Sequence, residues 1–150
     1  MLLHWACMMI TVVGLIGCNP PHIEGPQIVI ELARCWQLSR FCGEPTDVDI
    51  CIDFRKDGKF TIYQRTEELA YTTFTGTYTA DEEKSLLSGV YSDGVKWASS
   101  YHYTVDKEAE TLTLESVERP SEVSIYVPAK VPASATLSSR CASANDVRPL

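Results

Sequence analysis

Short segments of alternating apolar and polar residues recur between residues 34 and 128, and turn signals separate them. The clearest is 48–55, in which every second side chain is apolar and is expected to face a core: Val48, Ile50, Ile52 and Phe54. The residues between them, Asp49, Cys51 and Asp53, are expected to face out. One apolar face at this period is typical of a half-buried β-strand. Alternation and β-propensity together predict strands at residues 34–41, 48–55, 59–65, 71–79, 86–92, 97–105, 111–117 and 122–127.

The connections between these segments are short and contain turn residues, as in Lys56-Asp57-Gly58-Lys59 and Ser92-Asp93-Gly94. Short connections predict antiparallel neighbours, because parallel strands need a long crossover. An open sheet of this size would leave two unpaired edges, and closure removes both. The sequence therefore predicts an all-β fold, an antiparallel up-and-down barrel of about eight strands. A β-sandwich is the alternative.

An apolar segment without charged residues precedes this region and ends at a cysteine. It runs from Trp5 to Ile16, and Asn19-Pro20-Pro21 follows the cysteine at once. The segment is shorter than the roughly 18 residues of a membrane-spanning helix and suits a signal peptide. Its end, Leu15-Ile16-Gly17-Cys18, resembles the lipobox of bacterial lipoproteins, which implies that Cys18 is lipidated and becomes the first mature residue. A buried N-terminal helix is the alternative, because no Lys or Arg precedes the apolar run.

The domain plan that follows has four parts. We expect a lipoprotein signal peptide at 1–17, a lipidated cysteine and proline-rich tether at 18–33, a barrel at 34–128 and a C-terminal tail of mostly small and polar residues at 129–150. The expected location is the cell envelope, with a lipid anchor in the outer membrane and the body facing the periplasm or the cell surface. The expected partners are the membrane, through the lipid anchor, and a candidate small hydrophobic ligand, while the sequence names no protein partner.

The chain carries 20 acidic and 13 basic residues, a formal net charge of −7. Nucleic acids and anionic membrane surfaces are poor partners for such a body, because binding phosphates requires a basic face. No nucleic acid is therefore expected as a ligand.

Four cysteines remain once Cys7 leaves with the leader and Cys18 carries lipid: Cys35, Cys42, Cys51 and Cys141. An even number in an exported chain predicts disulfides, here with three possible connectivities. Proximity in the sequence favours Cys42–Cys51 together with Cys35–Cys141. The alternative is Cys35–Cys51 together with Cys42–Cys141. A zinc site is not expected, since the chain has no Cys-x-x-Cys and no histidine pair near the cysteines.

Several segments in order resemble the lipocalin-like domain of small lipoproteins of Bacteroidetes, over residues 34 to 132. The matching segments are Trp36-Gln37-Leu38, then 54–60, 74–78, 87–94, Trp97, 101–105 and 112–114. The resemblance implies a calycin-type barrel more firmly than it implies a ligand, since one fold hosts many functions. Lipocalins proper have glycine two residues before the first-strand tryptophan, where this chain has Arg34. For the arginine that commonly stacks on that tryptophan, Arg119 and Arg140 are the candidates.

Nine aromatic residues are expected to line the barrel: Trp36, Phe54, Phe60, Phe74, Tyr78, Tyr91, Trp97, Tyr101 and Tyr103. In one reading they form a pocket for a small apolar or amphipathic ligand, in which a ligand would partner the tyrosine hydroxyls. In the other they fill the core, and the protein is an interaction or structural module of the envelope.

An enzyme is not expected, because a nucleophile needs a base within hydrogen-bond reach. The only histidines after the leader are His22, in the tether, and His102, which alternates with inward tyrosines and so faces out. The acidic pairs Glu67-Glu68 and Glu82-Glu83 lie at turns and suit solvated edges. No glycine-rich phosphate loop is present, and we expect no metal or cofactor.

Overall fold

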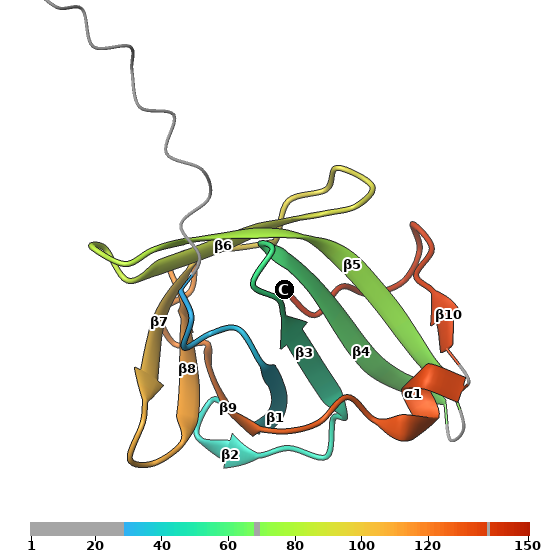
Figure 1. Cartoon of the computed structure of the whole chain (residues 1–150), viewed down its shortest axis with the longest axis horizontal. Coiled ribbons are helices and arrows are strands. Elements are labelled where there is room, and N and C mark those ends of the chain that lie inside the picture. Colours follow the sequence, from blue (N-terminus) through green and yellow to red (C-terminus); the bar gives the residue numbers. More distant parts are fainter. Residues whose placement is uncertain (1–28, 68–69, 138) are drawn as a thin grey trace, which may run out of the picture.

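The computed structural model describes residues 29–67, 70–137 and 139–150, and these residues form strands and one short helix (Figure 1). In chain order the elements are β1 (Cys35–Phe41), β2 (Glu44–Pro45), β3 (Ile50–Phe54), β4 (Lys59–Glu67), β5 (Ala70–Asp81), β6 (Leu86–Tyr91), β7 (Tyr101–Asp106), β8 (Thr111–Ser116), β9 (Val123–Pro128), α1 (Ala133–Leu137) and β10 (Ser139–Cys141).

Eight of the strands form a closed antiparallel ring in the order β1-β3-β4-β5-β6-β7-β8-β9, and β9 pairs with β1 to complete it. The predicted up-and-down barrel is confirmed. The ring is the architecture of a lipocalin-like domain. Closure is accompanied by a bulge in β1 between Leu38 and Arg40, where the register with β9 shifts by one residue.

Two short strands and the helix are added to the outside of the ring. β2 pairs with the end of β1, and β10 pairs in parallel with the first part of β5. Figure 1 shows α1 and β10 beside β5, on one side of the barrel. The predicted tail therefore covers part of the wall, and its last segment turns back into the ring.

The predicted strand 97–105 begins only at Tyr101, because residues 92–100 fold back along β6. Gly94 has a positive φ of 87°, and the backbone N–H of Trp97 donates to the carbonyl of Gly89. The indole of Trp97 lies where a side chain at Gly89 would stand, so this glycine is needed for the contact. Trp97 thus enters the core from a loop.

Strand β9 turns a different face to the interior from the one its composition indicates. Val123, Ile125 and Val127 share one face, as predicted, but that face points out of the ring and Val127 is 37% exposed. Tyr126 points inward instead and is 2% exposed. Its register opposite Leu112, an interior residue of β8, sets this orientation.

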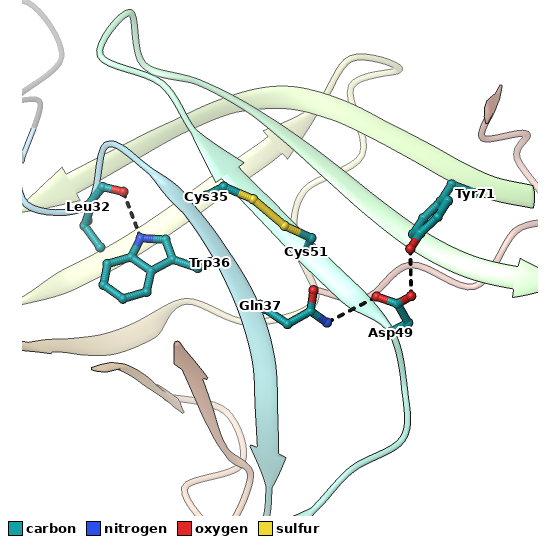
Figure 2. The surroundings of a disulfide bond; sticks show 7 residues. All are labelled: Leu32, Cys35, Trp36, Gln37, Asp49, Cys51 and Tyr71. Carbon is teal, nitrogen blue, oxygen red and sulfur yellow. Dashed lines mark hydrogen bonds between the residues drawn. A yellow bond between two sulfur atoms is a disulfide. The ribbon is translucent and has the colours of Figure 1, made fainter. Parts of the chain in front are cut away.

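Residues just before β1 close one part of the core. Val29 and Leu32 are buried in the same apolar cluster as the barrel interior, and the indole Nε1 of Trp36 donates to the carbonyl of Leu32 over 3.0 Å (Figure 2). The expected boundary between tether and barrel at residue 34 lies inside this packed turn.

Candidate functional site

The nine aromatic side chains expected inside the barrel are all there, and all are buried. Their exposed fractions run from 1% for Trp36 to 9% for Tyr101 and Tyr103. Several pack edge to face, with ring centroids 4.9 Å apart for Phe54 and Tyr78 and 5.2 Å apart for Phe60 and Trp97. Ring contacts join seven of the nine in one network, and Trp36 and Tyr103 lie in the same apolar cluster.

This packing leaves no open lumen beside the largest rings. A lumen wide enough for a ligand would leave its lining accessible to molecules the size of water, yet Trp36, Phe54 and Phe60 are each 1% exposed. Open depressions border the cluster, and one of about 510 Å³ lies against Phe60 and Tyr91. Another of about 360 Å³ runs beside Trp97 and is lined mainly by polar residues.

One interior group comes from the C-terminal tail. The side chain of Leu150, at the end of the tail, is 4% exposed and belongs to the interior cluster. Figure 1 shows this end of the chain, marked C, within the ring. The hydroxyl of Tyr91 donates to the carbonyl of Leu150 over 2.9 Å and accepts its backbone N–H over 3.2 Å.

Arg148 adds two contacts at the same place. Its guanidinium lies 4.6 Å from the centre of the Tyr91 ring and pairs with the carboxylate of Asp93 at 2.5 Å. Hydrogen bonds from Arg148 and from the backbone of Val95 hold the pKa of Asp93 below its usual value. Burial raises the pKa of Tyr91 to about 12, against the opposing effects of Leu150 and Arg148, so its hydroxyl stays protonated at neutral pH.

The disulfide links Cys35 of β1 to Cys51 of β3, with Cα atoms 6.6 Å apart (Figure 2). The favoured pairing of Cys42 with Cys51 and of Cys35 with Cys141 is therefore wrong, and only half of the alternative is formed. Cys42 and Cys141 are exposed free thiols.

Sheet order explains the pairing. Cys35 and Cys51 lie on adjacent strands and alternate with the inward Trp36 and Ile52, so the bridge lies on the outer face of the wall. β10, which carries Cys141, is separated from β1 by β5, β4 and β3. Cys51 was expected to face outward and does, but it is fully buried.

A polar cluster occupies the same outer face beside the disulfide (Figure 2). The Asp49 carboxylate accepts from Arg65 Nε and the Tyr71 hydroxyl at 2.7 Å each and from the Gln37 side-chain amide at 3.2 Å. Burial alone would raise the pKa of Asp49, but these hydrogen bonds outweigh it and keep that pKa below its usual value. A carboxylate held this way ties neighbouring strands together. Alternation placed Asp49 on the outer face, but it does not identify partners from other strands.

The arginine over Trp36 is its near neighbour in sequence. Arg34 lies 5.2 Å from the ring centre, in cation–π contact. Both candidates from the resemblance are wrong, because Arg119 pairs with Glu122 and Arg140 with Asp146. Arg34, two residues before Trp36, supplies the stacking cation.

The histidine and the acidic pair weighed for catalysis lie on the surface of the described part of the chain. His102 is exposed on β7, as are Glu82 and Glu83 at their turn. No group of three or more His, Cys, Asp or Glu able to hold a metal ion occurs among them. None of the helices in the described part of the chain is long and apolar enough to span a membrane.

Several predictions lie outside the described residues: the signal peptide, the lipidation of Cys18, the proline-rich part of the tether, His22 and Glu68. Comparison of the chain with models of protein families, with curated proteins and with solved structures finds no match. Function is therefore inferred from the geometry of the barrel and from the sequence of the leader.

Proposed function

We propose that this protein is a lipoprotein of the bacterial cell envelope whose self-filled, lipocalin-like barrel is a protein-interaction module. One observation carries the proposal: the nine aromatic side chains that would line a ligand pocket are each at most 9% exposed and belong to one apolar cluster. The interior is used for stability, and binding falls to the loops and rims.

The physical cost of opening the interior favours a module over a carrier. Each edge-to-face aromatic pair contributes about 0.5–1.5 kcal/mol beyond the burial of its area. A ligand in the centre would separate several such pairs, including Phe54–Tyr78 and Phe60–Trp97. The closed ring and the disulfide hold the wall rigid, and a rigid wall positions loops well for recognition.

The anchor rests on the lipobox resemblance at Cys18. A thioether-linked diacylglycerol supplies two chains, which anchor a protein stably where one chain does not. The acidic body is not attracted to an anionic surface, so the lipid at Cys18 would be what holds the protein at the membrane. The expected location is the outer membrane.

Binding of a small apolar or amphipathic ligand is the second candidate, and Leu150 is the observation that favours it. The tail supplies an apolar group to the core at Tyr91, where a foreign group of similar size would fit if the tail left.

Intrinsic fluorescence tests the filled interior, because Trp36 and Trp97 are the only tryptophans of residues 19–150 and both are buried. Titration of this soluble body with fatty acids, haem and bile acids should give no saturable change. A saturable change at one ligand per chain would overturn the module in favour of the carrier.

Replacement of the lipobox cysteine tests the anchor. Cys18→Ser should abolish incorporation of labelled palmitate and move the protein to the soluble fraction. Cys7→Ser, in the same leader, is the matched control and should change neither. Unchanged fractionation of the Cys18 variant would show that the leader is not a lipobox.

A further inference from the structure

The tail residues 148–150 are held at the end of β6 through three chemically different contacts. The Leu150 side chain is buried in the interior cluster, its backbone N–H and C=O both bond to the Tyr91 hydroxyl, and Arg148 stacks on Tyr91 and pairs with Asp93. An apolar group, a peptide group and a cation are thus recognised within three residues.

The docked residues 148–150 are separated from the rest of the tail by one exposed residue. Asp146 is clamped by Arg140, with nitrogen–oxygen distances of 2.6 and 2.8 Å, so the tail is fixed up to that residue. Val147 is 82% exposed, which separates the clamp from the docked residues. The contacts of residues 148–150 go to Tyr91, Asp93 and the interior cluster, whereas Asp146 is tied to Arg140 of β10, so residues 147–150 form a unit separate from β10.

The recognition does not depend on the tail being part of the same chain. The Tyr91 hydroxyl bonds only main-chain atoms, which every peptide offers, and Asp93 with the Tyr91 ring selects a guanidinium. Pro149 restricts the backbone between the two side chains, which lowers the entropy lost on docking. A second peptide with the same features would make the same contacts.

We propose that the rim formed by Tyr91 and Asp93 is a docking site for a short peptide of a partner protein, in which an arginine precedes a leucine-like residue by two positions. In the free protein residues 148–150 occupy this site in cis. The inference rests on the proposed interaction module and names the chemistry of its partner.

Because residues 148–150 occupy the site in cis, binding of a partner peptide depends on their release. A tethered segment competes at an effective concentration on the order of millimolar, so a free peptide binds well only when the tail is released. Part of the cis contact is solvent-exposed, since the Asp93 side chain is 47% exposed in its pair with Arg148. Salt therefore weakens the ion pair and the binding of the competing peptide alike.

The experiment uses the mature full-length protein in nanodiscs and a fluorescein-labelled synthetic peptide with the sequence of residues 143–150. Combined Arg148→Glu and Leu150→Asp releases the tail and leaves Tyr91 and Asp93 in place. Fluorescence anisotropy should show saturable one-to-one binding to this variant and at least tenfold weaker binding to the wild type. The peptide carrying Ala at either the arginine or the leucine position should bind at least fivefold more weakly.

Three further variants keep the test decisive. Val147→Asp, an equally polar change on an exposed residue of the same segment, should leave the peptide excluded as in the wild type. Arg148→Ala alone keeps Leu150 packed, so it guards against loss of folding and should give intermediate affinity. On the released background, Asp93→Asn should weaken binding and flatten its salt dependence.

No peptide binding by the released variant, with its thermal unfolding transition intact, would overturn the inference. Equal binding by wild type and released variant would overturn the occupation in cis. Titration of the released variant with 4-methylpentanoate, a carboxylate with a leucine-like chain, distinguishes failure of the peptide-docking inference from failure of the proposed interaction module. If neither probe binds, the inference fails and the module stands. If only the carboxylate binds, the peptide-docking inference and the interaction module both fail, and binding of a small ligand becomes the proposed function.

Discussion

Trp36 joins three parts of the barrel through one side chain. Its ring is buried in the interior, its Nε1 donates to the carbonyl of Leu32, and Arg34 lies over its face. The indole therefore fixes the turn before β1 against the wall. Its loss would remove a large apolar volume and a hydrogen bond at once.

Trp36→Ala should lower the free energy of unfolding by about 3–5 kcal/mol, the usual cost of truncating a buried tryptophan. Urea unfolding of residues 19–150, followed by circular dichroism, measures it. Val127→Ala, on the exposed face of β9, is the control and should stay within about 0.5 kcal/mol of the wild type. A loss below about 1 kcal/mol for the tryptophan variant would show that Trp36 is not a core residue.

Single residues also show where sequence reasoning stops. Tyr91 was predicted inside the barrel from alternation, and it is there. Leu150 was not predicted, because one leucine in a small and polar tail carries no periodicity. The arginine over Trp36 was sought far along the chain, while Arg34 lay two residues away. Contacts made by isolated side chains leave no pattern in a sequence.

At the scale of elements, β1 and β3 are joined by backbone pairing and by the Cys35–Cys51 disulfide. The bridge closes a loop with a sequence separation of 16, which includes β2 and the connection to β3. It therefore restricts the unfolded chain where the native connection has little secondary structure of its own.

Removing the disulfide with Cys35→Ala and Cys51→Ala should cost roughly 2–4 kcal/mol, as expected for a loop of this size. Chemical unfolding without reductant measures the loss. The double variant Cys42→Ala and Cys141→Ala removes the two free thiols and should change stability little. Peptide mapping of the unreduced wild type should find the 35–51 bridge alone. An equal loss in both double variants would contradict the assignment.

Most strands were predicted within a few residues, since alternation and turn chemistry are local signals. The exceptions have tertiary causes. Trp97 shares the period of Tyr101 and Tyr103 and so reads as strand, but Gly94 turns the chain back and Trp97 reaches the core from a loop. The outward face of β9 follows from its register with β8. β2, α1 and β10 are too short to predict, and they depend on pairing or packing with β1 and β5.

The whole molecule is a closed ring whose interior is occupied by its own side chains. Closure was predictable, because an open sheet would expose two edges. Whether the ring held a lumen was not, since the same aromatic residues line a pocket or fill a core. In the structure these residues are buried in one cluster, and the tail contributes an apolar group to it at Tyr91.

Native mass spectrometry of the protein purified gently from its own envelope tests the filled barrel most directly. We predict a mass equal to that of residues 18–150 with the proposed lipid and no further component, unchanged after incubation with fatty acids, haem and bile acids. A copurifying small mass that leaves on denaturation would contradict the account, identify the protein as a carrier and reveal the class of its ligand.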